Sequence, residues 1–241
     1  QFYTMSTTPT TMKAVVVHKI GDPTLTETLS VESDVPIPEP ATGEVLIKVA
    51  AAAINPIDWK LVRGDFPRKT PGGFGLDVSG VIEKIGPDTT TDLKVGDAIY
   101  ADVIKSISKT GSFGEYAIVE INSASPKPKN VDFIEAASLP LAGLTAVQGL
   151  VRKAEMKEGD KVLIFGGSGG VGSLAIQVAK ALGAGEITST GSSVDAIKAF
   201  GADHVVNYKE ENLMEALKGK DFDVVFDTIG GYEHWEIGHA S

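Results

Sequence analysis

Cysteine is absent from the 241 residues of the sequence. Its absence excludes disulfides and every zinc site built on thiolates. Histidine is scarce, and none of the four histidines pairs with a second ligand at the spacing of a metal site. We therefore predict no metal centre, and we expect His18, His204, His234 and His239 to be structural or solvated.

Long apolar runs and basic clusters are missing as well. No apolar run reaches the roughly 18 residues of a membrane span, and the polar N-terminus lacks the apolar stretch of a secretory signal. We expect a cytoplasmic protein. The net charge is −10, from 22 basic and 32 acidic residues. This balance argues against nucleic acid as the main partner, because a phosphate-binding surface needs clustered Lys and Arg.

The residues that are present are typical of a soluble globular protein, since 42% are apolar and 22% are charged. Residues 1–11 are polar and are predicted to be a disordered tail. Residues 12–130 hold short apolar or alternating runs between Gly and Pro turn signals, and such a pattern is typical of a β-rich barrel or sandwich. The predicted strands cover residues 13–19, 45–54, 78–85, 98–104 and 116–121.

The pattern changes near residue 131. Asp132 and Glu135 fit a capping box for a short helix that ends before Pro140, and residues 141–154 are typical of a second helix. Strand and helix patterns then alternate, which implies a parallel sheet with right-handed crossovers. The predicted strands are 161–165, 186–190, 204–208 and 223–227, and the predicted helices are 171–182, 194–200 and 212–217. A complete six-stranded dinucleotide fold would need two more strands.

The strongest motif is the glycine-rich segment 166–172, which follows a strand and opens an apolar helix. Within its GxGxxG pattern, Gly167 is expected to permit the tight turn, Gly169 to let a pyrophosphate approach, and Gly172 to let the helix pack closely. The amides around Ser168, Gly170 and Val171 would bind the phosphates at the helix N-terminus. The alternative, a plain glycine-rich turn, explains the surrounding strand–helix repeats less well.

The end of the second strand bears on the choice of cofactor. An NAD site usually has Asp or Glu there, to bind the ribose 2′-hydroxyl. Here the residues are Thr190, Gly191, Ser192 and Ser193, whose hydroxyls can donate to a 2′-phosphate. This end therefore favours NADPH, although the basic residue that usually binds the 2′-phosphate is also absent from the turn.

From about Met12 to Gly231 the sequence resembles the zinc-independent quinone oxidoreductases (zeta-crystallin-like) and the related enone oxidoreductases of the medium-chain dehydrogenase/reductase superfamily. The resemblance is carried by the glycine-rich segment and by five further motifs in the family's order and spacing. These are NPIDWK at 55–60, GLDVSG at 75–80, GSFGEY at 111–116, AASLPLAGLTA at 136–146 and GADHVVNY at 201–208.

The resemblance implies an α/β protein with a GroES-like catalytic domain (residues 12–130), a partial Rossmann NADP-binding domain (residues 131–241, strands one to four), and an active site in the cleft between them. It places Asn55 beside the nicotinamide and substrate, and Lys60 in the same cleft. It also implies cofactor contacts at Thr145, Ser192, Ser193 and Tyr208. Positions at the ends of the second and fourth strands add Thr190 and Gly230 to the predicted cofactor residues, together with the glycine-rich segment.

Structural roles are expected or possible at four residues. Lys60 could be an ordinary surface lysine, and Asn55 also ends a strand as a turn residue. Asp77 is expected to order the local backbone rather than to do chemistry. Asp227 could either cap the end of the fourth strand or contact the cofactor.

The implied activity is an NADPH-dependent, zinc-independent reduction of quinones or α,β-unsaturated carbonyls (enones). Zinc-dependent relatives polarise a carbonyl with the metal, but Leu76 and Asp77 stand where their His-Glu ligands would fall. A conjugated acceptor needs less activation, because charge spreads to an oxygen that hydrogen bonds stabilise. Asn55 and Lys60 are the candidate donors. No single residue stands out as the proton donor, and water can reprotonate the product.

Other functions remain open. The acceptor could be a trans-2-enoyl thioester, or the protein could bind NADPH in a structural or RNA-binding role without catalysis. The family's chain normally completes the sheet and returns to the catalytic domain. Two alternatives follow: the natural protein is longer, or the chain is a truncated product with impaired activity. A homodimer is an expectation only for the longer chain.

Overall fold

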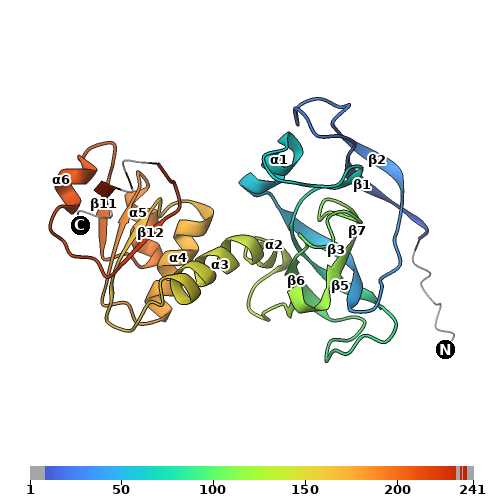
Figure 1. Ribbon diagram of the computed structural model, residues 1–241. Helices are drawn as coiled ribbons and strands as arrows, with labels where there is room; N and C mark the ends of the chain where they lie inside the picture. The colour runs from blue at the N-terminus through green and yellow to red at the C-terminus, as the bar shows by residue number, and fades with distance from the viewer. Residues whose placement is uncertain (1–8, 232–233, 235, 238–241) are drawn as a thin grey trace. The chain divides into compact units, whose positions relative to one another are not determined.

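The computed structural model describes residues 9–231, 234, 236 and 237. The chain divides into two compact units, Gln1–Leu141 and Ala142–Ser241, each of which is described by itself below (Figure 1). The first strand, β1 (Thr11–Val17), begins inside the predicted disordered tail, so Thr11 is ordered by strand pairing. Residues 1–8 of that tail lie outside the described residues.

The first unit holds two antiparallel sheets. Its five-stranded sheet has the order β7-β3-β5-β6-β8, and its three-stranded sheet has the order β2-β1-β4. An isolated bridge between Ala14 and Gly114 links β1 to the segment that precedes β7. The strands are β2 (Leu29–Pro36), β3 (Glu44–Ala53), β4 (Gly72–Gly73), β5 (Asp77–Ile85), β6 (Ala98–Asp102), β7 (Tyr116–Glu120) and β8 (Ala124–Pro126).

Alternating side chains build the core of this unit. Val45, Ile47, Val78, Ile82 and Ile99 are almost fully buried in one cluster between the strands. Alternate residues of a strand point to the same face, so these apolar positions turn one face of the sheet inward. The predicted β-rich unit is therefore confirmed, although its pattern did not reveal β2, β4 or β8.

A short helix that the sequence pattern did not predict follows β3. Helix α1 (Pro56–Arg63) has Asn55 as its N-cap, proline in its first turn and Gly64 at its C-terminal end in the left-handed conformation, with φ 95°. Proline suits the first helical position because the missing N–H has no intrahelical partner there. The turn expected at Asn55 is thus the start of a helix.

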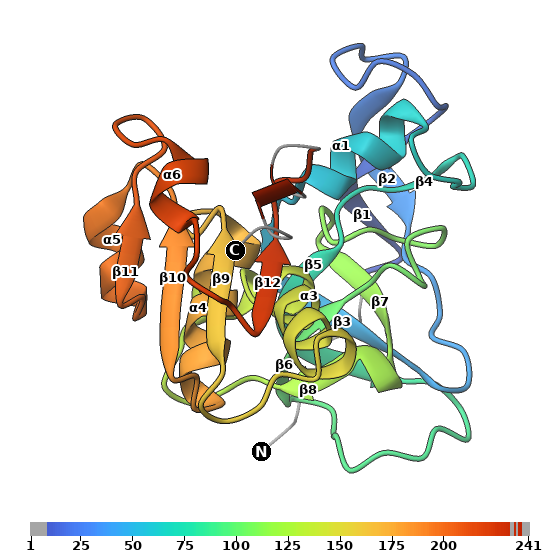
Figure 2. The ribbon, with the colours of Figure 1, turned by 60° about the vertical axis from the view of Figure 1, so that its left-hand side comes forward.

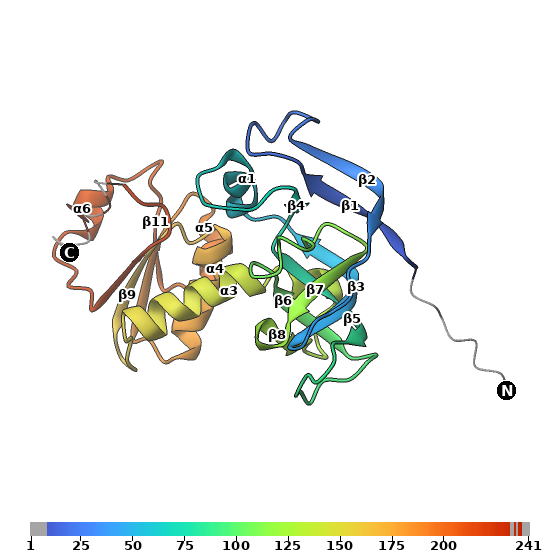
Figure 3. The ribbon, with the colours of Figure 1, turned by 45° about the vertical axis from the view of Figure 1, so that its right-hand side comes forward.

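Three helical segments connect β8 to the second sheet. Helix α2 (Phe133–Ala137) begins with the predicted capping box, because Asp132 and Glu135 each accept a hydrogen bond from the other's backbone amide, at 2.8 and 2.9 Å. Residues 141–154 form α3 (Pro140–Val147) and, directly after it, a π-helical segment, η2 (Gln148–Lys153). Figure 3 draws this stretch as one continuous coil, labelled α3.

The second unit is a four-stranded parallel sheet of order β11-β10-β9-β12, in which the strands lie side by side (Figure 2). This order places the first strand of the unit between the second and the fourth, as in the first four strands of a dinucleotide-binding sheet. The elements are β9 (Lys161–Phe165), α4 (Gly170–Ala181), β10 (Glu186–Thr190), α5 (Val194–Phe200), β11 (His204–Val206), α6 (Leu213–Leu217) and β12 (Val224–Asp227).

Strand β9 packs on both of its faces. Val162 and Ile164 lie in one apolar cluster with residues of α4 and α5, while Leu163 and Phe165 lie in a second cluster with Leu217. A parallel strand covered on both faces is apolar throughout, which explains why its sequence is an unbroken apolar run. Within the described residues no helix is long and apolar enough to cross a membrane.

Candidate functional site

The glycine-rich segment begins with a sharp turn at the end of β9. Gly166 has φ +80°, in the left-handed region that favours glycine. Its amide donates to the Thr190 hydroxyl at 3.2 Å, and the Gly167 amide donates to the Thr190 carbonyl at 2.9 Å. The turn was predicted at Gly167, but the residue with the left-handed conformation is Gly166. Both amides bond to Thr190, so the turn is held by hydrogen bonds to the end of β10.

Gly167 and Gly172 have no room for a side chain. A Cβ atom at Gly167 would lie 2.1 Å from the Ser189 hydroxyl, and one at Gly172 would lie 2.1 Å from the Gly166 carbonyl oxygen. The predicted close packing at Gly172 thus agrees with the geometry. Gly169 and Gly170 are exposed, and the nearest neighbours of a Cβ atom there would be 3.3 and 4.0 Å away.

Helix α4 presents its free amides directly after this turn. Its first intrahelical hydrogen bond runs from the Ser173 amide to the Gly169 carbonyl, at 2.9 Å. The amides of Gly170, Val171 and Gly172 precede that bond, and so they have no intrahelical acceptor. Together with the positive end of the helix dipole, they form a site that suits an anion such as a diphosphate.

The neighbouring turn, which follows β10, contains two serines, and a third serine lies beside it. Ser168 is exposed, and its hydroxyl would lie 3.5 Å from a Cβ atom at Gly191. Ser192 is half-buried and Ser193 is exposed. The structure thus brings Ser168, Thr190, Ser192 and Ser193 together at the carboxyl ends of β9 and β10, where ligands bind in open α/β sheets.

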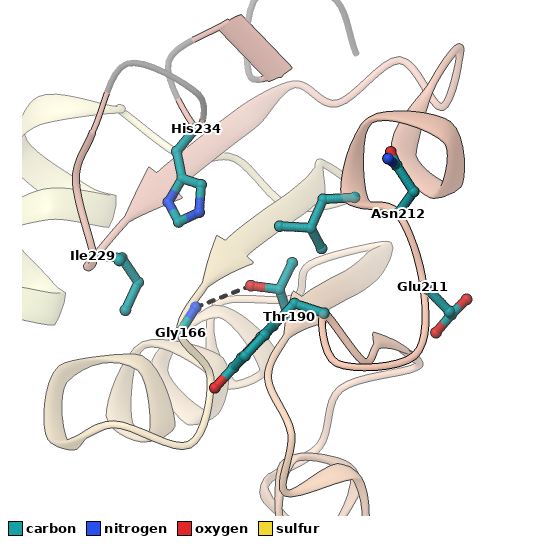
Figure 4. A pocket seen from close by; sticks show the side chains of 8 residues that line it. Gly166, Thr190, Glu211, Asn212, Ile229 and His234 are labelled. Atoms are coloured by element: carbon teal, nitrogen blue, oxygen red, sulfur yellow. Dashed lines mark hydrogen bonds between the residues drawn. The ribbon is translucent and has the colours of Figure 1, made fainter.

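A cavity of about 470 Å³ opens at this edge of the sheet (Figure 4). In Figure 4, Ile229 and His234 lie on one side of Thr190, and Glu211 and Asn212 lie on the other. Predicted cofactor residues Thr190 and Tyr208 line the cavity, and the sequence reasoning missed most of the others. The full lining is Gly166, Thr190, Tyr208, Glu211, Asn212, Leu213, Ile229 and His234.

Asp227 acts as a cap at the end of β12. Its Oδ1 atom accepts hydrogen bonds from the amides of Ile229 and Gly230, at 2.9 and 3.0 Å, and lies 3.3 Å from Nδ1 of His234. Burial opposes ionisation of this carboxyl, but these hydrogen bonds outweigh it and lower the pKa of Asp227. Gly230, a predicted cofactor residue, has φ +81° and is positioned by this cap.

In the first unit, two buried carboxyl groups hold Asn55. Its side-chain amide donates to Oδ2 of Asp77 at 2.8 Å, and its backbone amide donates to Oδ2 of Asp58 at 2.7 Å. Oδ1 of Asp77 also accepts from the Leu141 amide, at 2.8 Å, which confirms the expectation that Asp77 orders the local backbone. The bond to Asp77 uses one of the two side-chain N–H groups of Asn55.

A third carboxyl group, Asp102, lies directly opposite Asp77 across the β5–β6 pair. Burial raises the pKa of Asp58 to about 6. The hydrogen bond from the Asn55 amide lowers this pKa by less than burial raises it, and the negative charge of Asp102 raises it further. Burial likewise raises the pKa of Asp77 to about 6, against hydrogen bonds from Asn55 and Leu141. Burial also raises the pKa of Asp102. The carboxyl groups beside Asn55 thus retain protons more readily than exposed ones do.

Two further predicted residues lie on exposed or half-buried helix positions. Lys60 is half-buried on α1, and its Nζ atom lies 5.7 Å from the ring centroid of Trp59. Thr145 is exposed on α3, one turn after Ala142, which is the neighbour nearest to a Cβ atom at Gly170. Their chemical roles stay predictions.

Comparison with known proteins places this arrangement in a family. The sequence profile of the Alcohol dehydrogenase GroES-like domain matches residues 41–129, and that of the Zinc-binding dehydrogenase domain matches residues 170–236. The quinone oxidoreductase of Rattus norvegicus is 34% identical over 230 residues, which cover 93% of this chain and 67% of the relative. The chain belongs to the zinc-independent quinone and enone oxidoreductase family.

Other members of this quinone and enone oxidoreductase family are similar over a comparable range. The chloroplastic NADPH-dependent alkenal/one oxidoreductase of Arabidopsis thaliana is 43% identical over 232 residues, or 92% of this chain and 58% of the relative. The chain therefore spans less than two thirds of that relative's length. The solved structure of the quinone oxidoreductase from Coxiella burnetii matches with a TM-score of 0.79 and 36% identity, over 91% of this chain and 69% of that one.

The second matching profile is named for zinc, but the described residues of this family member do not present a set of zinc ligands. The sequence has no cysteine. Among the residues that the structure describes, no group of three or more His, Asp or Glu side chains could hold a metal. His234 instead stacks on Phe165, with ring centroids 4.4 Å apart, and Nε2 of His18 lies 2.8 Å from the Ser30 hydroxyl. The fourth histidine, His239, lies outside the described residues.

Proposed function

We propose that the whole protein is an NADPH-dependent, zinc-independent reductase that transfers hydride to quinones or α,β-unsaturated carbonyls. The observation that carries the proposal is the row of free amides at Gly170, Val171 and Gly172, at the carboxyl edge of a β11-β10-β9-β12 parallel sheet. The names of the Arabidopsis and rat relatives support the cofactor and the two acceptor classes.

The described residues fit a dinucleotide. The backbone of Gly169 and Gly170 is open to solvent, so a diphosphate could approach the helix amides without meeting a side chain. No acidic side chain stands at Thr190, Ser192 or Ser193 to repel a 2′-phosphate. When bound, the nicotinamide cofactor supplies the hydride.

The residues of the chain bind the cofactor, orient the groups around it and stabilise the charge that develops on the acceptor. The amides of α4 hold the diphosphate, and the cap at Asp227 fixes the loop that carries Gly230. Asp77 holds the side chain of Asn55 so that its second N–H is presented to a ligand oxygen. We assign to Asn55 and Lys60 the hydrogen bonds that stabilise the acceptor oxygen as negative charge develops there.

Location and assembly belong to the same proposal. We expect the protein in the cytoplasm, whereas the Arabidopsis relative is named as chloroplastic, and we expect a homodimer only if the full-length chain is longer. Reduction of trans-2-enoyl thioesters and a non-catalytic NADPH-binding role are the alternatives that the acceptor experiment separates from the main proposal.

Steady-state rates of the full-length protein with NADPH test the activity on a panel of quinones, short enones and trans-2-enoyl thioesters. We expect turnover of quinones or enones. The variant Lys60→Ala should lower kcat/KM for enones at least about tenfold, through loss of a charged hydrogen-bond donor, while leaving NADPH affinity unchanged.

The matched control is Lys69→Ala, which removes an exposed lysine of the same unit and should leave every rate unchanged. An unchanged enone rate in Lys60→Ala would remove Lys60 from the mechanism. Turnover of enoyl thioesters alone would select the alternative acceptor, and the absence of turnover with every acceptor would contradict the catalytic assignment.

A further inference from the structure

Helix α1 presents two cations beside one exposed aromatic ring. Nζ of Lys60 lies 5.7 Å from the ring centroid of Trp59, and Cζ of Arg63 lies 4.6 Å from the same centroid. Both distances are within the roughly 6 Å over which a cation is attracted to an aromatic face. Trp59 is 38% exposed, so solvent reaches the ring. Because residues three apart are neighbours on a helix, one acid can serve either of the two cations.

Asp65 is that acid, and the end of the helix brings it to Lys60. Gly64 has the left-handed conformation, and the amides of Gly64 and Asp65 both donate to the Lys60 carbonyl, at 3.1 and 3.0 Å. The hydrogen bond from the Arg63 side chain lowers the pKa of Asp65; burial opposes this, and the charges of Arg63 and Lys60 lower the pKa further. The ammonium group of Lys60 therefore acts on the Asp65 carboxylate.

Arg63 holds both carboxylate oxygens of Asp65. Its Nε atom donates to Oδ1 at 2.8 Å, and its Nη2 atom forms an ion pair with Oδ2. A guanidinium group matches a carboxylate in this two-pronged contact, and an ammonium group cannot reproduce it. Within the part of the chain that the structure describes, the ammonium group of Lys60 has neither an ion-pair nor a hydrogen-bond partner. The pairing of Arg63 with Asp65 thus leaves Lys60 uncommitted.

The other acid of α1 is buried. On α1 and the segment 64–69 the acids are Asp58 and Asp65, and the other charged residues are cations. Asp58 is 1% exposed, and its Oδ2 atom accepts the Asn55 amide at 2.7 Å. It belongs with Asp77 and Asp102 to the buried carboxyl groups beside Asn55. Among the described residues, none of these three buried acids forms an ion pair with a lysine or an arginine.

Residues 20–28 pack on the end of α1, and both of their acids have partners. A backbone hydrogen bond of 3.0 Å joins this segment to the helix. Asp22 accepts the amide and the hydroxyl of Thr24, at 2.8 and 2.7 Å, and Glu27 forms an ion pair with Lys19 at 2.8 Å. Asp65 is therefore the acid that the lysine of α1 meets when the arginine partner is removed.

We propose that Arg63 is a positioning residue: by holding Asp65, it leaves the ammonium group of Lys60 free to donate to the acceptor oxygen. The inference rests on the proposed function and deepens it, since it assigns a residue that acts through Lys60. Asn55 caps the first turn of α1, and Asp65 follows its last turn. A pair between Lys60 and Asp65 would therefore draw the ammonium group away from Asn55, the other donor assigned to the acceptor.

Chemical labelling of Lys60 tests the competition for Asp65 without turnover. Acetic anhydride acetylates the free amine of a lysine, and an ion pair lowers the amount of free amine because it stabilises the ammonium form. In Arg63→Gln we expect acetylation of Lys60, followed by peptide mass spectrometry, to slow about two- to fivefold, as an exposed ion pair implies. The double variant Arg63→Gln/Asp65→Asn should restore the rate. Lys94, an exposed lysine between β5 and β6, is the internal reference.

Steady-state rates with NADPH and a short enone test whether the free ammonium group matters to the acceptor. In Arg63→Gln we expect kcat/KM to fall by a similar factor, about two- to fivefold, with an unchanged Kd for NADPH. The double variant should recover kcat/KM, which a purely structural role of Arg63 does not predict. The matched control is Lys84→Gln, which breaks the exposed ion pair with Glu39 and should change neither the acetylation of Lys60 nor kcat/KM.

The outcomes separate the inference from the proposed function. Unchanged acetylation of Lys60 in Arg63→Gln, or a slowing that Asp65→Asn does not reverse, would overturn the inference. The expected change in acetylation with an unchanged kcat/KM would overturn it as well, and the reductase assignment would stand in all three cases. If the unaltered protein binds no NADPH and turns over no acceptor, the proposed function and the inference fail together, whatever the acetylation rates show.

Discussion

At the scale of single residues, the most unusual feature is the concentration of buried acids beside Asn55. Asp58 and Asp77 are each 1% exposed, and Oδ1 of Asp58 has no hydrogen-bond partner. No lysine or arginine forms an ion pair with Asp58, Asp77 or Asp102 among the described residues. Buried carboxylates without cations favour the protonated state, which is why their pKa values rise.

These raised pKa values predict a stability that falls as the pH rises. The unfolded carboxyls titrate near pH 4 and the folded Asp58 and Asp77 near pH 6, so the folded state binds more protons between these values. Their contribution is fully present below about pH 4 and is lost as the pH rises through about 6. In Asp58→Asn we expect the free energy of unfolding at pH 7.5 to increase by an amount on the order of 2 kcal/mol.

Denaturant unfolding at a series of pH values measures this effect. The asparagine variant should lose part of the pH dependence between pH 4.5 and 7.5, because one titrating group is gone while an acceptor for the Asn55 amide remains. Asp34→Asn, which alters an exposed acid on β2, is the control and should leave the curve unchanged. A destabilised Asp58→Asn protein at pH 7.5 would show that the charge of Asp58 is required.

The register between strands explains why this cluster escaped prediction. Asp77 and Asp102 are far apart in the sequence and meet only because β5 and β6 pair residue against residue. Asp58 joins them because α1 follows β3, the other neighbour of β5. Local patterns identify Asn55 and Asp77 as residues of interest, but the partners of a buried polar group depend on tertiary pairing that periodicity does not encode.

At the scale of elements, two glycines at the junction between β9 and α4 differ in the space available for a side chain. A Cβ atom at Gly172 would overlap the Gly166 carbonyl and the Gly167 backbone, which cannot move without breaking the turn. Gly170 lies in the same helical turn with open space around it. We expect Gly172→Ala to destabilise the protein by about 2 kcal/mol or more, and Gly170→Ala to be neutral or stabilising by up to about 1 kcal/mol.

Thermal unfolding of the two alanine variants checks this contrast directly. Both replace glycine by the best helix former, so helix propensity cannot explain a difference between them. Similar Tm values for the two would mean that the backbone around Gly166 yields to a side chain at position 172.

Elements whose apolar residues recur at strand or helix spacing were predictable from the sequence, and the others were not. In the second unit, β9, β10 and α5 have the predicted ends, and β11 ends at Val206 rather than at residue 208. Strand β2 escaped because four of its consecutive residues are exposed, so it shows no apolar alternation. Helix α1 is too short for a clear apolar stripe, although Pro56 in its first turn was a usable signal.

At the scale of the whole molecule, fold class and family followed from the order of motifs and elements. Alternating strands and helices after residue 161 dictated a parallel sheet, and the observed order β11-β10-β9-β12 agrees with it. The cavity residues Glu211, Asn212, Leu213 and Ile229 were missed, because they lie in loops whose sequences carry no chemical motif. Gly166 was the exception, since it opens the glycine-rich segment and could have been recognised from its place after β9.

The central claim is that the amides at the start of α4 bind the diphosphate of a reduced nicotinamide dinucleotide. Titration of the full-length protein with NADPH and with NADH, followed by the fluorescence of the reduced ring, tests it most directly. The account predicts a saturable signal with a lower Kd for NADPH than for NADH. The absence of a saturable signal with either dinucleotide would contradict it.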